Sequence, residues 1–205
     1  MKRDIRELSI EDIENFCVEH GMRTYVSNQI YSWIWNNSCS SFGDMSNLSK
    51  NNREIFSEHF SINKITEDYH EKSNDGTIKI KFKLFDGNFV EGVLIPQEKR
   101  MTACISSQVG CSLSCKFCAT GTIGRIRNLT AGEIYDQVVA IGDKSKEFYN
   151  LPLTNIVFMG MGEPLLNYKN VIRSIHFITS EEGLQMSYKR VTLSTSGIAK
   201  MIRRL

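Results

Sequence analysis

The chain has 205 residues, of which 41% are hydrophobic and 23% charged, and this composition is typical of a globular protein with one domain and a small second one. The formal net charge of +2 neither requires nor excludes a nucleic-acid partner. The charged N-terminus shows no signal peptide and no run of about 18 apolar residues occurs, so we expect a cytoplasmic protein without membrane spans or permanent disulfides.

Residues 1–60 are predicted to form a small helical accessory domain. Ser9 is predicted to be an N-cap, with Asp12 at the capping-box position, and Gly21 is expected to end this helix. A loop over 36–44 separates the second and third helices. The residues expected in the domain core are Ile13, Phe16, Cys17, Val26, Ile30, Trp33, Ile34, Ile55, Phe56 and Phe60.

Residues 61–97 are predicted to form β-hairpin strands. Asn74–Gly76 is a hairpin signal, and apolar residues alternate with three lysines over 77–84, before a returning strand over 89–95. The lysine row is open to two interpretations, contact with RNA phosphates or a solvated sheet face, and the second is favoured about twofold.

Residues 98–205 alternate between strands and helices, which predicts a parallel α/β fold. Thr130 and Glu133 form a capping box that begins the first helix. The predicted strands span 101–107, 155–159 and 190–194, and the helices begin near residues 130, 167 and 198.

Four of the six cysteines lie between Cys104 and Cys118. Cys111, Cys115 and Cys118 are separated by three residues and then two, a spacing that can bring three thiolates to one metal centre. Thiolates suit an iron–sulfur cluster or zinc. Two interpretations follow: a [4Fe-4S] cluster whose fourth iron is open to a chelating molecule, or a structural zinc with Cys104 as fourth ligand.

The motif Cys111-x-x-x-Cys115-x-x-Cys118, with an aromatic residue before the last cysteine, resembles the radical S-adenosylmethionine (SAM) signature. The segments 106–111 and 158–167 resemble the dual-specificity RNA methyltransferase family, which methylates C2 of an adenosine in 23S rRNA and in tRNA. The resemblance implies an α/β fold: a partial (β/α) radical SAM barrel, preceded by β-hairpin strands and by a small helical domain. It also implies that this helical domain, residues 1–60, helps to dock structured RNA. It also implies a three-cysteine [4Fe-4S] cluster that reduces SAM to a 5′-deoxyadenosyl radical.

The resemblance assigns further site residues. Glu91, in the segment 86–96, matches the family's proton acceptor, although an isolated strand glutamate would usually face solvent. Gly162 and Glu163 match a SAM-contacting pair, and a tight turn before a helix is the alternative. Ser194 matches a SAM-contacting serine, and a helix N-cap is the alternative.

Cys104 matches the family's resolving cysteine. The resemblance implies a route that uses two SAM molecules, one to methylate a protein cysteine and one to abstract hydrogen from that methyl group. The carbon radical then adds to C2, and Cys104 releases the methylated base by forming a transient disulfide. The alternative for Cys104 is an ordinary buried strand cysteine.

The methyl-carrying cysteine belongs to the family's C-terminal region, and only three of six expected strand–helix units occur before Leu205. We therefore expect a truncated chain that does not complete methyl transfer alone. The expected partners are 23S rRNA, tRNA and a small electron-transfer protein, and we expect a monomer. The alternatives are the related adenine-C8 rRNA methyltransferase and a non-catalytic RNA-binding module with a structural zinc.

Overall fold

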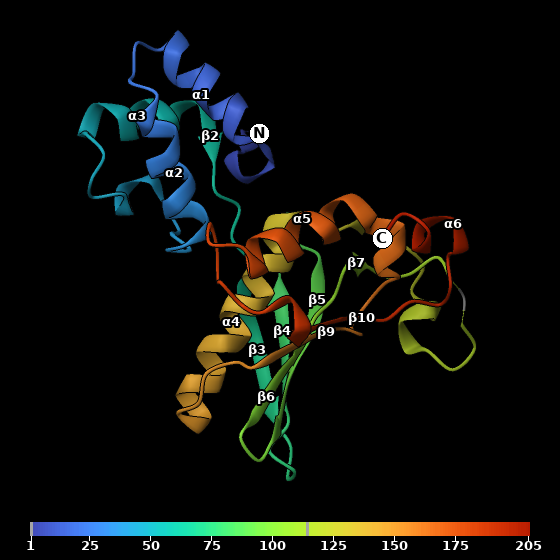
Figure 1. Ribbon diagram of the computed structural model, residues 1–205. Coiled ribbons are helices and arrows are strands. Elements are labelled where there is room, and N and C mark those ends of the chain that lie inside the picture. The colour runs from blue at the N-terminus through green and yellow to red at the C-terminus, as the bar shows by residue number, and fades with distance from the viewer. Residues whose placement is uncertain (1, 114) are drawn as a thin grey trace. The chain divides into compact units, whose positions relative to one another are not determined.

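The computed structural model describes residues 2–113 and 115–205. The chain forms two compact units (Figure 1). Unit 1 comprises Met1–Lys64 and His176–Met186, and unit 2 comprises Ile65–Ile175 and Ser187–Leu205. In the described part of the chain, no helix has the length and apolar character needed to cross a membrane.

The secondary structure follows the predicted order of helical, hairpin and alternating segments. The α-helices are α1 (Ile10–Glu19), α2 (Tyr25–Trp35), α3 (Lys50–His59), α4 (Ala131–Tyr149), α5 (Tyr168–Thr179) and α6 (Ala199–Ile202). The strands are β1 (Arg3–Asp4), β2 (Phe60–Ser61), β3 (Thr66–Lys72), β4 (Ile78–Lys83), β5 (Phe89–Gln97), β6 (Arg100–Cys104), β7 (Gln108–Val109), β8 (Arg127–Asn128), β9 (Asn155–Phe158) and β10 (Val191–Leu193). The short 3₁₀ helices are η1 (Ile5–Glu7), η2 (Phe42–Asp44), η3 (Ala119–Thr122), η4 (Pro164–Asn167) and η5 (Tyr188–Arg190).

Unit 1 confirms the predicted first helix and most of its predicted core. Ser9 Oγ accepts from the Asp12 backbone N–H, and the Asp12 side chain accepts from the Ser9 N–H, so the capping box is present. The predicted core residues that are buried are Ile13, Cys17, Val26, Ile30, Ile34 and Phe56.

The placement of Trp33 in the core was wrong. Trp33 is half-buried and donates to Asn47 Oδ1, whereas Trp35 is fully buried. Trp35 stacks on Phe177 with ring centroids 3.7 Å apart, and Phe177 belongs to the segment His176–Met186. The prediction failed because helical spacing alone does not place Trp35 on the apolar side of α2. The distant segment that contains Phe177 covers Trp35 and buries it. Phe16, Ile55 and Phe60 are also only half-buried.

Unit 2 is built on a six-stranded mixed sheet with strand order β10-β9-β6-β5-β4-β3. Strands β3 to β6 form an antiparallel meander, and β6, β9 and β10 are parallel. The three parallel strands are those that the alternating segments predicted, so the α/β fold class is confirmed. Parallel order places the C-terminal ends of these strands at one edge of the sheet.

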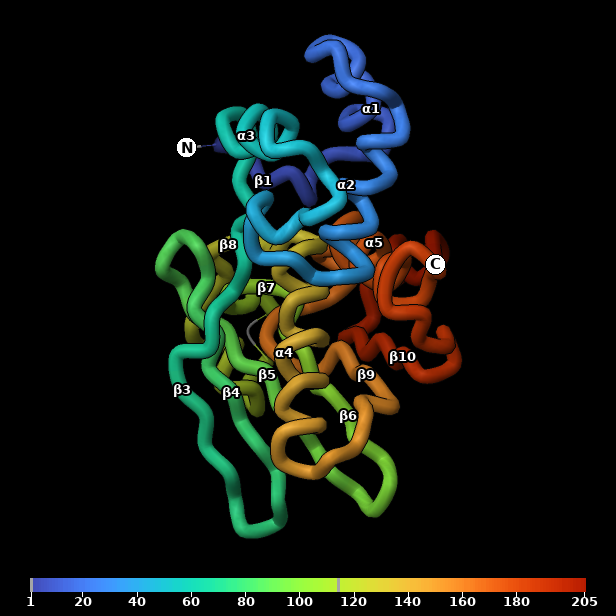
Figure 2. The backbone as a smooth tube through the Cα atoms, turned by 90° about the vertical axis from the view of Figure 1, so that its left-hand side faces the viewer, coloured from blue at the N-terminus to red at the C-terminus, as the bar shows by residue number. Residues whose placement is uncertain are grey.

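The two faces of the sheet differ. Ile78, Ile80 and Phe82 are fully buried while the intervening lysines are exposed, so the predicted alternation is confirmed. Helix α4 packs on the buried face, where a Cβ on Gly92 would lie 2.9 Å from Ile141 Cδ1 (Figure 2). The opposite side is the open face, defined by Lys79, Lys81, Lys83, Phe89, Glu91, Val93, Cys104, Val157 and Ser194, which share one side of the sheet by register and alternation.

The lysine row on the open face is partly paired with carboxylates. Lys79 Nζ lies 2.9 Å from Glu91, and Lys81 Nζ lies 2.7 Å from Asp68 and 3.9 Å from the centroid of the Phe89 ring. These contacts agree with a solvated sheet face. Contact of the lysines with RNA stays a prediction.

Candidate functional site at the strand ends

The cysteine loop follows β6 and is closed at its base by a short ribbon. Strands β7 and β8 pair antiparallel, with Val109 opposite Arg127. Gly110 has φ 72°, and a Cβ there would lie 1.8 Å from Gly124 O, so the crossing of the two strands requires glycine. The loop between these strands carries Cys111, Cys115 and Cys118.

Backbone N–H groups donate to two of the loop sulfurs. Leu113 N–H donates to Cys111 Sγ over 3.4 Å. Hydrogen bonds from the N–H groups of Gly121 and Thr120 lower the pKa of Cys118, which favours its thiolate. Donors of this kind fit thiolates that ligate an iron–sulfur cluster.

Among the residues that the structure describes, the three cysteines of the loop do not form a preassembled metal site. Over residues 2–113 and 115–205, no three Cys, His, Asp or Glu side chains gather closely enough to hold a metal ion. The assignment of the three cysteines as ligands, and the alternative zinc site with Cys104, therefore stay predictions. All six cysteines are free thiols.

Cys104 ends β6 and lies between two strands, opposite Val93 of β5 and Val157 of β9. Burial raises the pKa of its thiol, and a hydrogen bond from the Met159 N–H partly offsets this. The thiol is half-buried and belongs to the open face. Its predicted role in a transient disulfide is not tested.

Glu91 lies on the neighbouring strand and on the same face as Cys104. Its carboxylate is half-exposed and forms an ion pair with Lys79, as in the solvent-facing alternative. Its backbone carbonyl accepts from Ser106 Oγ over 2.5 Å, which ties β5 to the segment after β6. The structure thus places the predicted proton acceptor and resolving cysteine on adjacent strands of one accessible face.

The Gly160–Glu163 segment follows β9 and packs against the base of the cysteine loop. Gly162 has φ 93°, and a Cβ there would lie 2.5 Å from Gln108 Cβ. Glu163 begins η4, with its carboxylate accepting from the Leu165 N–H, so the turn that was the alternative for this motif is present.

The carboxylate of Glu163 is 4% exposed and is bound by protein donors. It accepts from Thr195 Oγ1 at 2.7 Å, Ser196 N at 2.8 Å and Ser196 Oγ at 2.9 Å. Burial acts to raise the pKa of Glu163, but these bonds and the one from Leu165 outweigh it and hold the pKa below its usual value. Glu163 therefore connects the ends of β9 and β10.

Gln108 is a site residue that the sequence prediction missed. It is fully buried, and its Oε1 accepts from the Glu163 N–H while its Nε2 donates to Asn128 Oδ1. Asn167 Nδ2 also donates to the carbonyls of Ser107 and Leu129, at 2.8 Å each. The sequence signal that could have identified Gln108 is an amide side chain directly after a predicted buried strand, because an amide buried there needs hydrogen-bond partners.

Ser194 follows β10 at the same edge of the sheet. It is exposed, and none of the described residues forms a hydrogen bond with its side chain. The alternative of a helix N-cap is wrong, because Ile198 occupies the N-cap position of α6. Ser194 is therefore open to solvent at the position predicted to contact SAM.

Arg127 holds the second strand of the ribbon by ion pairs. Its guanidinium binds Glu133 with two contacts of 2.8 Å and reaches Asp86 Oδ2 at 2.5 Å. Glu133 is 1% exposed and also completes the predicted capping box with Thr130. The Arg127 hydrogen bond is the main cause that lowers the pKa of Asp86 to about 2.

Comparison with known proteins agrees with this arrangement. The family model described as "Ribosomal RNA large subunit methyltransferase N-terminal domain" matches residues 3–62, and the radical SAM superfamily model matches residues 105–205. A radical SAM methyltransferase from Sphaerobacter thermophilus, a crystal structure, is 37% identical with a TM-score of 0.85 over 98% of this chain and 59% of that chain.

Curated relatives carry the same family name. A probable dual-specificity RNA methyltransferase RlmN of Cytophaga hutchinsonii is 58% identical over 100% of this chain and 56% of its own length. The dual-specificity RNA methyltransferase RlmN of Geobacter sulfurreducens is 45% identical over 98% of this chain and 54% of its own length. The chain thus spans little more than half the length of these relatives. With both family models and these relatives in agreement, the chain belongs to the RlmN family of radical SAM RNA methyltransferases.

Proposed function

We propose that this chain supplies the cluster-binding and SAM-binding part of an RNA methyltransferase that acts on C2 of adenosine in 23S rRNA and tRNA. The observation that carries the proposal is the meeting of three loops at the C-terminal ends of β6, β9 and β10. Buried hydrogen bonds of Gln108 and Glu163 join these loops to one another.

Cys111, Cys115 and Cys118 are the proposed ligands of a [4Fe-4S] cluster. The N–H donors to Cys111 and Cys118 support this, because they stabilise thiolates in a loop whose base is fixed by Gly110. When bound with one iron open, such a cluster supplies an electron to SAM.

The SAM-binding role that we propose is divided among the other two loops. Ser194 has an exposed hydroxyl at the strand end, and the lack of a side chain at Gly162 lets its loop pack closely against Gln108. Because the Glu163 carboxylate is occupied by Thr195 and Ser196, we assign it the task of holding these loops in place.

Glu91 and Cys104 lie on the open face, and we propose that the target adenosine approaches this face. A half-exposed carboxylate can take the C2 proton, and the Cys104 thiol, whose pKa burial raises, is held against β9 by the Met159 N–H. We further propose two SAM molecules per turnover, a small electron-transfer protein as reductant, a cytoplasmic location and a monomeric state.

The proposal is tested by anaerobic reconstitution of the chain, with iron and acid-labile sulfide measured against protein. We expect about four irons and sulfides per chain, and 5′-deoxyadenosine after addition of dithionite and SAM. Cys115→Ala should lose both, whereas Cys39→Ala, a buried cysteine of unit 1, should keep both. Stoichiometric zinc in place of iron, in protein from iron-replete cells, would instead establish the structural zinc alternative.

A further inference from the structure

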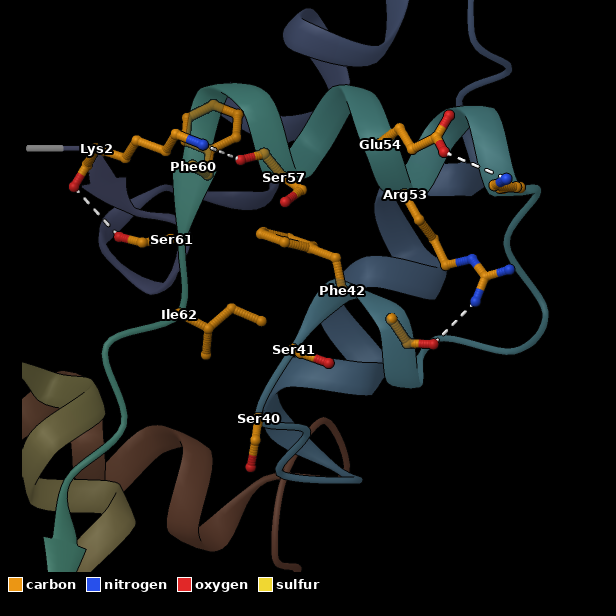
Figure 3. Close-up of a pocket in the computed structure, with 12 residues that line it drawn as sticks. Lys2, Ser40, Ser41, Phe42, Arg53, Glu54, Ser57, Phe60, Ser61 and Ile62 are labelled. Carbon is orange, nitrogen blue, oxygen red and sulfur yellow. Dashed lines mark hydrogen bonds and ion pairs between the residues drawn. The ribbon is translucent and has the colours of Figure 1, made fainter.

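Two of the chain's four histidines meet in unit 1. His20 is the C-cap residue of α1, and His59 is the last residue of α3. Their ring centroids lie 5.0 Å apart, with the ring planes inclined by 72°, and both side chains are exposed. Neither histidine lines the cavity between η2, α3 and β2 (Figure 3), and none of the roles assigned above uses them.

Each imidazole is held by a hydrogen bond to its own helix. His20 Nδ1 lies 2.9 Å from Phe16 O, and His59 Nδ1 lies 2.9 Å from Ile55 O. A carbonyl oxygen can only accept, so each Nδ1 carries a hydrogen and donates it. In the neutral ring this leaves the lone pair of Nε2 available to a metal ion, and an Nδ1–H bond to a backbone carbonyl is the usual support of a metal-binding histidine.

The ring of Phe16 keeps the two imidazoles together. Its centroid lies 4.0 Å from that of His20 and 5.2 Å from that of His59. Phe16 is itself packed against Phe56 and Phe60, at 5.1 and 4.8 Å. Because the imidazoles are ordered by these contacts before a ligand arrives, binding would cost little further side-chain entropy.

The spacing and the electrostatics of the pair both suit a cation. Zinc lies about 2.0–2.1 Å from each imidazole nitrogen that binds it, so the centres of two rings on one tetrahedral ion lie about 5 Å apart. The pair also lies at the C-terminal ends of two helices, where the helix dipole favours positive charge. Imidazole nitrogens suit zinc, nickel and copper, whereas magnesium and calcium prefer oxygen ligands.

We propose that His20 and His59 form a site for a divalent transition-metal ion, which joins the C-terminal ends of α1 and α3. Over residues 2–113 and 115–205 no three His, Cys, Asp or Glu side chains gather around one ion, so the pair supplies two ligands and water completes the coordination. The site stands apart from the proposed cluster and needs neither SAM nor RNA. The alternative is that the two imidazoles only pack on Phe16.

The test titrates zinc sulfate into the full chain, labelled with ¹⁵N at histidine and kept under reducing conditions. Thiolates also bind zinc, so the readout is the NMR shift of the ring nitrogens, which reports on the imidazoles alone. Before zinc is added, His20 and His59 should both carry the hydrogen on Nδ1. With zinc, their Nε2 signals should shift together with one shared midpoint.

The variant His59→Gln separates a shared ion from ions bound singly. It should raise the zinc midpoint of His20 at least about tenfold, because loss of even a supporting partner of a ligand costs about 10–100-fold in metal affinity. His20→Gln should do the same to His59. Zinc should also slow amide exchange in the last turns of α1 and α3 in the parent chain but not in either variant.

Two controls accompany these variants. His176→Gln removes an exposed histidine that pairs with Glu182 and lies outside the pair, and it should leave both midpoints within about twofold. Magnesium should shift none of the four ring signals. Urea unfolding midpoints without zinc confirm that each variant is folded.

Three outcomes would overturn the inference. An unchanged His20 midpoint in His59→Gln would show that the rings bind ions singly. Shifts of all four histidines at one zinc concentration would show unspecific binding to surface imidazoles. A hydrogen on Nε2 instead of Nδ1 in the metal-free chain would remove the ligand atom on which the site depends. Because the readout uses neither cluster nor SAM, failure of the proposed function leaves this test unaffected.

Discussion

The cysteine loop and the two loops that follow β9 and β10 are built in different ways. The cysteine loop is fixed at its base by Gly110 and Arg127, while the thiol of Cys118 is left half-exposed. The other two loops are joined to each other and to the base through the buried side chains of Gln108 and Glu163. This difference suits the proposed roles, in which one loop receives a metal cluster and the other two hold a fixed shape.

The largest expected effect breaks the base of the cysteine loop. Gly110→Ala places a Cβ 1.8 Å from the Gly124 carbonyl oxygen, so the ribbon of β7 and β8 cannot close. We expect a loss of about 3 kcal/mol or more in the free energy of unfolding, with little iron bound after reconstitution. Urea unfolding and iron content measure these two quantities.

Gly124→Ala is the matched control for this change. Gly124 also has a positive φ, of 70°, but an added Cβ meets nothing within 4 Å. Gly124→Ala should lower the free energy of unfolding by only about 1–2 kcal/mol, because alanine is disfavoured in the left-handed conformation. Equal losses in the two variants would contradict the assignment of a steric role to Gly110.

The second prediction breaks the connection between the β9 and β10 loops. Glu163→Gln replaces the carboxylate that accepts hydrogen bonds from Thr195 and Ser196. We expect the free energy of unfolding to fall by about 2–3 kcal/mol at pH 7. The exposed Glu71→Gln should change stability by less than about 0.5 kcal/mol. Hydrogen exchange should show faster exchange at residues 194–197 in Glu163→Gln alone.

The pH dependence of this effect has a definite sign. The folded-state pKa of Glu163 is below its unfolded value, so its contribution is present above the unfolded pKa and is lost as the pH falls through the folded one. The stability difference between the parent chain and Glu163→Gln should therefore shrink on acidification. A difference that grows toward acid pH would show that Glu163 is protonated in the folded state.

The third prediction concerns the ion pairs that hold β8. Because its folded-state pKa is about 2, Asp86 contributes about 2 kcal/mol to the free energy of unfolding. This contribution is present above pH ~4 and is lost between about pH 4 and 2. Asp86→Asn should lose this amount at pH 7 and approach the parent chain near pH 2. The exposed Asp143→Asn is the control, and urea unfolding across this pH range gives the result.

The smallest effect is expected on the open face. Glu91 and Lys79 are about half-exposed, so their ion pair contributes little, and Glu91→Gln should change the free energy of unfolding by less than about 0.5 kcal/mol. Thermal or urea unfolding tests this directly. A loss above 1 kcal/mol would show that Glu91 supports the sheet, and would weaken its assignment as a proton acceptor that is free to act.

Local sequence patterns predicted most of the fold. Capping boxes at Ser9 and Thr130 and the period-two pattern of β4 are short-range signals, because capping and alternation depend on residues only a few positions apart. The alternation of strands and helices after residue 98 likewise predicted the parallel strands β6, β9 and β10. The cysteine spacing and its neighbouring motifs predicted the family.

The tertiary structure decided what depends on distant residues. The burial of Trp35 requires Phe177, which lies more than a hundred positions along the chain, and no helical periodicity contains that information. The carboxylate of Glu163 could be predicted to lie at a strand end, but its partners Thr195 and Ser196 are fixed only when β9 and β10 pair. The sequence by itself therefore determined the elements, their order and the residue types at the strand ends. Only the folded chain decided which polar groups satisfy one another, because a buried polar group takes whichever partner tertiary packing brings within hydrogen-bond distance.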